Sequence, residues 1–384
     1  MENNRQTIET GDIFASHAGE FLKNHTLHPV QLKAFRAIQA CRTATLGGHQ
    51  SRCDGCGHTR QAYNSCRNRH CPKCQFVKRA QWVDKLAANL PAVRHFHLVF
   101  TIPGCLHTLF YSNQAVAYGL LFTAAGRALK QCSQSMAFPG AKTGAVAIRH
   151  TWGQTLVYHP HIHMIVPAGG LTEDRSEWIP SAKNFLVPVK VLSAVFRRVL
   201  CTLLESALAD GRLALPADGK DFQTIKGLCY KTPWVVYCEK PFSSADNLIR
   251  YLGNYTHRVA ICNHRIIAHE NGKVRFYYKD YKNNGAKRVL TLDAQEFIRR
   301  FLQHILPAGF CKIRYFGFMA LSTMKANLAR CYDLIGKTVF LPVLEGLSGQ
   351  EVFRAVTGID PLRCPSCKTG WMRPIAAILP CNPG

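Results

Sequence analysis

Four residues in the middle of the chain have types and spacings that suit phosphodiester chemistry. His161 and His163 are two positions apart, so on a β-strand both imidazoles project from one face and can share a divalent cation. Tyr251 and Tyr255 are four positions apart, so on a helix their phenols lie one above the other. A cation beside two phenolic nucleophiles suits the cleavage of a DNA strand that keeps the bond energy in a phosphotyrosine.

Neither spacing is specific by itself. Among 17 histidines, about one His-x-His pair should arise by chance, and this chain has three, at 95/97, 159/161 and 161/163. A second Tyr-x3-Tyr occurs at 277/281, in a segment that we interpret as sheet and DNA-backbone contacts. The ordinary alternatives are histidines of the core and tyrosines at its boundary, with the ring buried and the hydroxyl in water.

A cation held by His161 and His163 needs a third ligand. His150 lies on the strand before them and would face His161 if the turn between the two strands centres near residue 155. His159 and Gln154 are the alternatives. Three protein ligands leave positions open for a phosphate oxygen, so we expect the cation to act as a Lewis acid.

A cluster of cysteines near the N-terminus predicts a second kind of metal site. Two Cys-x2-Cys turns can direct four thiolates at one Zn²⁺, and four protein ligands leave no position for water, so this site would be structural. The simplest tetrad is Cys53, Cys56, Cys71 and Cys74. Cys66 and His70 are alternates, or together with Cys41, His49 or His58 they could hold a second ion. The later pair Cys364/Cys367 has only Cys381 nearby and could form only an incomplete metal site.

The charge balance predicts a polyanionic partner. Forty-eight Lys and Arg against 23 Asp and Glu give a net charge of +25, which favours nucleic acid over a membrane surface. Basic residues crowd the cysteine cluster, and we expect Arg67, Arg69 and Lys73 to contact DNA phosphates there. The alternative is a zinc-stabilised surface that only faces solvent.

The ends and the apolar runs of the chain predict a cytoplasmic protein. The first ten residues lack the pattern of a signal peptide, and the longest uncharged apolar run, near 115–126, is too short to span a bilayer. The 17 cysteines are therefore expected to be thiols rather than disulfides.

Helices and strands alternate irregularly along the chain, which predicts an α+β fold. We expect a zinc-binding domain over 1–92, a catalytic domain over 93–310 and a helical, cysteine-containing tail over 311–384. The predicted strands are 94–102, 145–152, 156–167 and 232–238, with a hairpin over 273–281 and 289–292. The predicted helices are 31–42, 76–90, 113–136, 189–208, 245–259, 293–306 and 320–334.

Several strings in this order resemble the rolling-circle insertion-sequence transposases of the HUH nuclease superfamily, the type with two tyrosines. They span roughly residues 40–320 and are CRTATLGGH, CDGCGHTRQAYNSCRNRHCPKCQ, HFHLVFTIPG, RHTWGQTLVYHPHIHMIVPAGG, YLGNYTHRVAICNHRI and FLQHILPAGFCKIRYFGF. The resemblance implies an N-terminal zinc-binding domain followed by a catalytic domain with a central antiparallel sheet flanked by helices. It also implies that His161 and His163 hold Mg²⁺ or Mn²⁺. Relaxases of the superfamily take a third histidine ligand from upstream of this pair, which supports His150 as the third ligand here.

The same resemblance assigns roles to the tyrosines. Tyr251 would attack a DNA strand to leave a 5′-phosphotyrosine and a free 3′-OH, and Tyr255 would serve a second cleavage or the strand transfer. Arg258, beside them, would contact the DNA. The partners implied are element ends and single-stranded donor and target DNA at the bacterial nucleoid. Rival interpretations are a plasmid relaxase or replication initiator with the same chemistry, and a non-catalytic zinc-dependent DNA-binding regulator.

Overall fold

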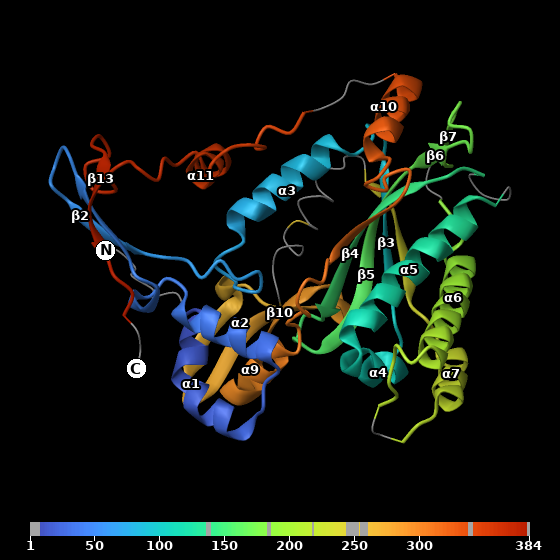
Figure 1. Ribbon diagram of the computed structural model, residues 1–384, viewed down its shortest axis with the longest axis horizontal. Helices are drawn as coiled ribbons and strands as arrows, with labels where there is room; N and C mark the ends of the chain where they lie inside the picture. Colours follow the sequence, from blue (N-terminus) through green and yellow to red (C-terminus); the bar gives the residue numbers. More distant parts are fainter. Residues whose placement is uncertain are drawn as a thin grey trace.

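The computed structural model describes residues 8–135, 140–182, 186–216, 219–242, 253, 260–336 and 341–381. The molecule is elongated, with a small sheet at one end, a unit of helices and strands near the middle and a larger sheet covered by helices at the other end (Figure 1). Among the described helices, none has both the length and the apolar character needed to cross a membrane. The fold is α+β, as predicted.

The larger sheet is antiparallel throughout and has the strand order β12-β4-β5-β3-β8. Valine, isoleucine, phenylalanine and histidine dominate its central strands, as is usual for half-buried or fully buried strands. The sheet consists of β3 (His95–Thr101), β4 (Gly144–Trp152), β5 (Tyr158–Pro167), β8 (Val236–Phe242) and β12 (Ile313–Gly317). The predicted central antiparallel sheet is therefore confirmed.

One face of this sheet packs on a layer of helices. Ile162, Met164 and Val166 of β5 point to this face and are fully buried, because alternate residues of a strand share a face. The layer consists of α4 (His107–Ser112), α5 (Gln114–Ser133), α6 (Val189–Ala209) and α7 (Phe222–Lys231). In Figure 1, α5 crosses in front of the strands, with α6 and α7 beside it.

The opposite face is only partly covered. Val146, Ile148 and Ile165 lie on this face and are buried under α3 (Phe76–Ala88) and α10 (Met324–Ile335). Farther along the same face, β4 and β5 carry histidines that line an open cavity. The sheet thus separates an apolar core from a polar site.

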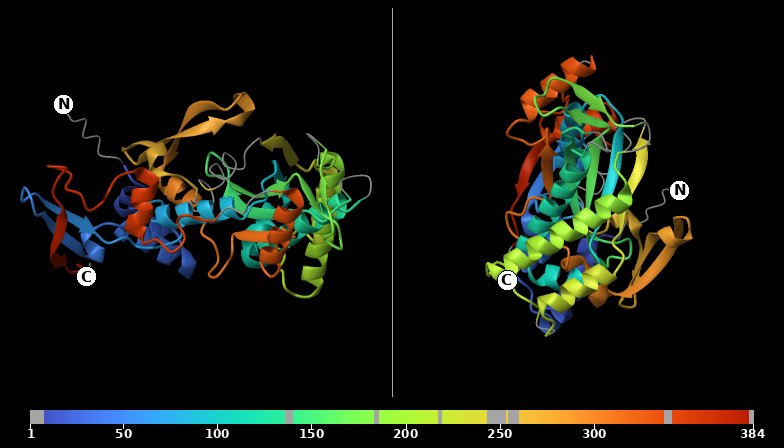
Figure 2. Two further views of the ribbon diagram at one scale, coloured as in Figure 1. Left: turned by 90° about the horizontal axis from the view of Figure 1, so that it is seen from above. Right: turned by 90° about the vertical axis from the view of Figure 1, so that its right-hand side faces the viewer.

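The middle unit joins the N-terminal helices to a segment far along the chain. Three helices pack on a three-stranded sheet with the order β11-β10-β9, and Phe14, Phe35, Phe276, Phe297 and Phe301 fill the core between them. The elements are α1 (Thr10–Asn24), α2 (Pro29–Ala40), β9 (Ile266–Glu270), β10 (Lys273–Asp280), β11 (Ala286–Asp293) and α9 (Ala294–Leu302). The β10–β11 hairpin projects from the body, as the gold strands of Figure 2 show.

The small distal sheet combines both ends of the chain. Its order is β13-β1-β2, and its strands are β1 (Gly48–Cys53), β2 (Thr59–Tyr63) and β13 (Met372–Ile378). The C-terminal segment reaches it by running beside α3, where α11 (Gly349–Thr357) packs (Figure 1). The remaining elements are β6 (Gly169–Leu171), β7 (Trp178–Pro180) and the short 3₁₀ turns η1 (Ala44–Leu46), η2 (Gly104–Leu106), η3 (Asn263–Arg265) and η4 (Tyr281–Asn283).

Two sequence predictions about the elements change. The residues from 311 onward do not form a tail of their own, because β12 is an edge strand of the larger sheet and β13 pairs with β1. The predicted strand 232–238 begins later, at Val236. The predicted helix 245–259 lies outside the described residues except for Gly253.

Candidate active site and metal centres

Three histidines meet on the open face of the larger sheet. His150 of β4 pairs directly with His161 of β5, and His163 lies two residues farther along β5 on the same face. Their ligand nitrogens lie within 4.8 Å of one another, and all three side chains are buried. The structure groups His150 with the pair, whereas His159, one of the two predicted alternatives, lies outside the group. The side-chain amide of Gln154, the other alternative, bonds to the Lys279 amide and to the hydroxyl of Tyr281.

Hydrogen bonds fix the orientation of two of these rings. Nδ1 of His161 donates to the carbonyl oxygen of His159 at 2.6 Å, which leaves its Nε2 lone pair toward the group. Nδ1 of His163 is 2.8 Å from Nε2 of His97, and Nδ1 of His97 is 3.1 Å from Oε2 of Glu239. Because a carboxylate only accepts, this chain of bonds runs from His163 through His97 to Glu239 and leaves Nε2 of His163 for a ligand.

Burial keeps the three imidazoles neutral. Desolvation lowers the pKa of His161 to about 3 and holds the pKa values of His150 and His163 well below their ordinary value. Neutral imidazole is the form that binds a metal. The group therefore presents nitrogen donors at neutral pH, which fits a divalent cation shared by three histidines.

The histidines line a cavity of about 890 Å³ between the larger sheet and the middle unit. Its opposite wall is aromatic and basic, and the Nζ of Lys287 lies 3.6 Å from the ring centre of Tyr277. Tyr281 is 63% exposed beside it. That wall also includes Arg265, Tyr278 and Lys279. The cavity therefore combines a cation site with surfaces that suit bases and phosphates.

The turn between β4 and β5 is held by the middle unit. Leu156, in the turn, is fully buried in the core of that unit, although its φ of 63° is in the left-handed region. Its carbonyl oxygen accepts from Nε2 of Gln303 at 2.9 Å and Nε2 of His304 at 3.0 Å. The guanidinium of Arg265 donates to the carbonyl oxygen of Gln154 at 2.6 Å. These contacts fix the hairpin that carries the three histidines.

The predicted tyrosines, Tyr251 and Tyr255, and the predicted DNA contact Arg258 lie outside the described residues. Two nearby positions are described. Gly253, between the tyrosines, is buried and so close to Val83 of α3 that a Cβ would collide with its Cγ2. Ala260 lines the cavity of the histidines. The chain thus lies beside α3 at Gly253 and at the cavity at Ala260.

The cysteines form two groups, which corrects the predicted tetrad of Cys53, Cys56, Cys71 and Cys74. One group contains Cys71 and Cys74 with Cys41 and Cys66. The other contains Cys53 and Cys56 with Cys364 and Cys367. The physical reason is that β1 and β2 carry the first knuckle to the distal sheet, away from the second. His70, an alternate ligand, instead accepts a hydrogen bond from the Leu306 amide at 3.1 Å.

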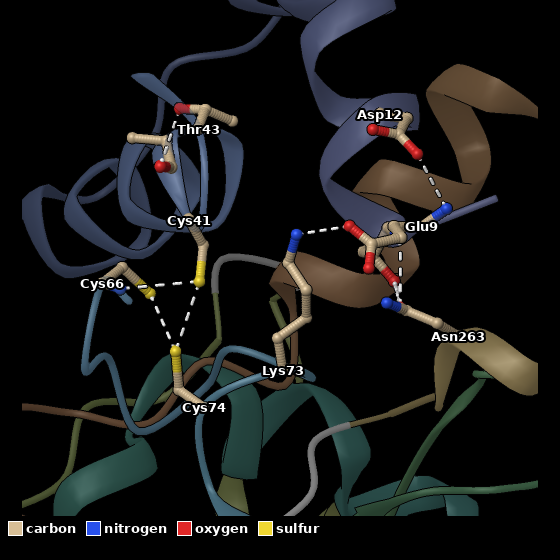
Figure 3. A network of polar contacts seen from close by, with 10 residues as sticks. Glu9, Asp12, Cys41, Thr43, Cys66, Lys73, Cys74 and Asn263 are labelled. Carbon is tan, nitrogen blue, oxygen red and sulfur yellow. Dashed lines mark hydrogen bonds and ion pairs between the residues drawn. The ribbon is translucent and has the colours of Figure 1, made fainter. Parts of the chain in front are cut away.

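The first group has the geometry of a structural zinc site. The Sγ of Cys74 is 3.3 Å from that of Cys41 and 3.5 Å from that of Cys66 (Figure 3). Sulfurs about 2.3 Å from one tetrahedral Zn²⁺ lie about 3.8 Å apart. Hydrogen bonds among the four thiols lower the pKa of Cys41 to about 7 and raise the pKa values of Cys66 and Cys71, as expected of sulfurs held this close together. These residues fit Zn²⁺.

Two basic residues of the loop that carries Cys66, Cys71 and Cys74 bind other parts of the protein. Arg69 donates from Nη1 to the carbonyl oxygen of Phe310 at 2.9 Å, and Lys73 forms an ion pair with Glu9 (Figure 3). Of the three predicted DNA contacts in this loop, only Arg67 is exposed. The structure thus places Arg69 and Lys73 against protein groups, where they fasten the loop to its neighbours.

Sequence reasoning missed the support behind His163. The His95/His97 pair is one of three His-x-His pairs in the sequence, but nothing in the sequence assigns it a role, and Glu239 gives no signal. Nothing local shows that β8 brings Glu239 opposite His97 on β3, because the two residues are 142 positions apart.

Comparisons with known proteins found matching families and relatives. A family described as a transposase zinc-binding domain matches residues 13–102, and one described as a putative transposase matches residues 144–327. The chain is 41% identical over 378 residues to the putative transposase y4qJ of Sinorhizobium fredii, covering 96% of this chain and 95% of that protein. It is 28% identical over 366 residues to the transposase for insertion sequence element IS801 of Pseudomonas savastanoi pv. phaseolicola, covering 90% and 84%. No solved structure matches.

The fold, the histidine group and the cysteine groups together define a transposase with a zinc-binding domain. The chain belongs to the IS91 family of transposases.

Proposed function

We propose that this transposase cuts and rejoins single-stranded DNA by transesterification at the histidine group, with Tyr251 and Tyr255 as nucleophiles. The observation that carries the proposal is the set of three buried, neutral histidines, His150, His161 and His163, at an open cavity with a basic and aromatic wall. A bound Mg²⁺ or Mn²⁺ would polarise the scissile phosphate there.

The chain's own residues have separate roles in this proposal. His150, His161 and His163 would hold the cation, while His97 and Glu239 keep the ring of His163 in its ligand orientation. The phenolate oxygen of a tyrosine attacks the phosphorus, and the 3′-oxygen of the preceding nucleotide leaves and takes up a proton. The product is a 5′-phosphotyrosine with a free 3′-OH, and attack by a 3′-OH reverses the step. One phosphodiester replaces another, so no nucleotide triphosphate is consumed.

The position of the chain around the tyrosines supports their assignment. Val83, the neighbour of Gly253, packs on the cluster that contains Ile148 and Ile165, which share the sheet face of the three histidines. Ala260 is five residues after Tyr255 and lines the cavity. Five residues span at most about 18 Å even when extended, and this short separation along the chain supports the assignment of Tyr255.

The cavity wall suggests the path of the strand. Exposed Tyr281 offers a face on which a base can stack, and Lys279 and Lys287 can neutralise phosphates next to it. We assign the zinc-binding part of the chain, with the exposed Arg67, to duplex docking at the element ends, and Arg258 to the cut strand. A transposase that acts on element ends in the chromosome would be cytoplasmic and located at the nucleoid.

A strand-cleavage assay tests this function. The purified protein is incubated with Mn²⁺ or Mg²⁺ and an oligonucleotide from an element end, labelled in turn at its 5′ and 3′ ends. We expect the 3′-labelled part to become attached to protein and the 5′-labelled part to be released with a free 3′-OH. H161A/H163A should abolish both products. Tight binding without cleavage by the wild type would instead support a DNA-binding regulator.

A further inference from the structure

The second cysteine group joins residues from the two ends of the chain. Cys53 ends β1 and Cys56 follows it, while Cys364 and Cys367 precede β13. The Sγ atoms of Cys53 and Cys367 are 3.7 Å apart, as are those of Cys56 and Cys364. This spacing matches the roughly 3.8 Å between sulfurs on one tetrahedral Zn²⁺ and is far from the roughly 2.05 Å of a disulfide.

The backbone around these four sulfurs has the form of two facing metal knuckles. The amide of Gly55 donates to the Sγ of Cys53 at 3.3 Å, and the amide of Gly370 donates to the Sγ of Cys367 at 3.3 Å. The residue after each knuckle, Gly57 or Lys368, is left-handed, with φ of 73° and 63°. Amide donors of this kind stabilise thiolates rather than neutral thiols.

Gly370 shows how tightly the two knuckles meet. A Cβ at this position would collide with the Sγ of Cys53. The Trp371 amide donates to Oδ1 of Asp54 at 2.7 Å, and the Asp54 amide donates to the carbonyl oxygen of Trp371 at 3.1 Å. The C-terminal segment at Gly370 and Trp371 therefore packs closely against the N-terminal knuckle at Cys53 and Asp54.

The distal sheet has almost no apolar core with which to hold itself together. Its buried cluster consists of Cys53, Cys364 and Met372, with Cys367 packed against it. Three short strands with so little buried apolar surface need a covalent or metal cross-link to stay folded. The four sulfurs occupy the place where such a cross-link belongs.

We propose that Cys53, Cys56, Cys364 and Cys367 bind a second structural Zn²⁺, which fastens the C-terminal ribbon to the N-terminal hairpin. The zinc-binding module of this chain then extends beyond residues 13–102 and is completed by a segment more than 300 residues away. This inference is independent of the proposed strand cleavage, because it concerns only the metal content and the folding of the distal sheet.

Metal content tests the proposal. Full-length protein purified with reductant is assayed for zinc by mass spectrometry. We expect two Zn²⁺ per chain in the wild type and in C381S, whose cysteine is exposed and outside both groups, but one in C364S/C367S and one in C53S/C56S. One Zn²⁺ in the wild type that C364S/C367S retains would overturn the proposal.

A variant that misfolds would lose both ions whichever cysteines it lacks, so a second measurement uses the wild-type protein. Wild-type protein is refolded with Co²⁺, and hydrogen exchange is followed in β13 with and without a chelator. We expect metal removal to raise exchange at Arg373 and Ala376, which pair with Arg52 and Gln50 of β1, before it affects the larger sheet. Unchanged exchange in β13 after complete metal removal would contradict a metal clasp.

Discussion

At the scale of single residues, the proposed metal site depends on which nitrogen of each histidine is available to bind a cation. The bonds of His161 to a carbonyl oxygen and of His163 to His97 leave both Nε2 atoms available. Glu239 sets the tautomer of His97, so in the proposed function it would act on metal binding through His97 and His163 without touching the cation. Partners of this kind commonly contribute 10–100-fold to metal affinity, roughly 1.4–2.7 kcal/mol.

Removal of that carboxylate is the first prediction. E239A should weaken Mn²⁺ binding about 10–100-fold, because His97 no longer has a partner that fixes its tautomer and the ring of His163 loses its orientation. Titration calorimetry on folded protein measures the change. E345A is the matched control, since Glu345 only pairs with Lys85 on the surface. Equal affinities for E239A and the wild type would show that the His97 relay is not part of the metal site.

The buried histidines outside the metal group predict a pH dependence of folding. Burial lowers the pKa of His304 to about 3 and that of His95 to about 4. The unfolded chain takes up these protons near pH 6.5 and the folded protein does not. Stability is therefore complete above pH 6.5 and falls as the pH drops toward 4, by about 1.4 kcal/mol per pH unit for each such histidine.

Urea unfolding of the metal-free protein at several pH values between 7.5 and 5 measures this loss. His304 bridges Thr151 and the carbonyl oxygen of Leu156, and glutamine can keep the second bond. H304Q should therefore show a pH slope that is smaller by about one proton. An identical slope in H304Q would mean that His304 is protonated in the folded protein.

At the scale of elements, the β4–β5 hairpin is clamped by a unit that is remote in sequence. Arg265, Gln303 and His304 bind the carbonyl oxygens of its turn, and Leu156 is inserted into the apolar core of that unit. The geometry of the three histidines is thus fixed from both ends of the hairpin, by the sheet and by the middle unit.

Truncation of the inserted side chain tests this clamp. L156A should destabilise the protein by about 2–4 kcal/mol, because it leaves a cavity in the buried cluster that also contains Phe297 and Phe301. It should also slow strand cleavage. Urea unfolding and the cleavage assay measure the two effects. L341A, at an 80% exposed position, should change stability by less than about 0.5 kcal/mol. If L156A cleaves DNA at the wild-type rate, the hairpin does not need the clamp.

At the scale of the whole molecule, the +25 charge and the basic cavity wall favour a polyanion at the same opening that leads to the histidines. Lys279 and Lys287 are exposed on the projecting hairpin, which gives them access to a passing strand. Contacts of this kind appear as a salt dependence of affinity, because each neutralised phosphate releases counterions.

Replacement of both lysines should therefore change the salt dependence. In K279A/K287A, the slope of log K against log salt for a single strand should become shallower by about 1.4, which corresponds to two lost phosphate contacts. Fluorescence anisotropy between low and moderate salt measures it. K231A is the control, because Lys231 ends α7 on the opposite face of the larger sheet. An unchanged slope would place the strand elsewhere.

The sequence was sufficient for contacts that are local in the chain. His150 could be predicted as the third histidine because the register of a hairpin can be counted from its turn, and the register confirms that it faces His161. The pairing of the cysteines could not be predicted, since a Cys-x2-Cys turn shows a knuckle but not its partner, and Cys367 is 314 residues from Cys53. The core shared by Phe14 and Phe301 could not be predicted either, because the two residues are remote in sequence and no local pattern shows that they meet.

The most direct test of the account is to identify the amino acid that carries the DNA. Wild-type protein is allowed to react with single-stranded element-end DNA and Mn²⁺, digested with nuclease and protease, and analysed by mass spectrometry. We predict a nucleotide on Tyr251 or Tyr255, absent from Y251F/Y255F and from H161A/H163A but present in Y281F, whose tyrosine lines the same cavity. A nucleotide on another residue, or cleavage by Y251F/Y255F at the wild-type rate, would contradict the central claim.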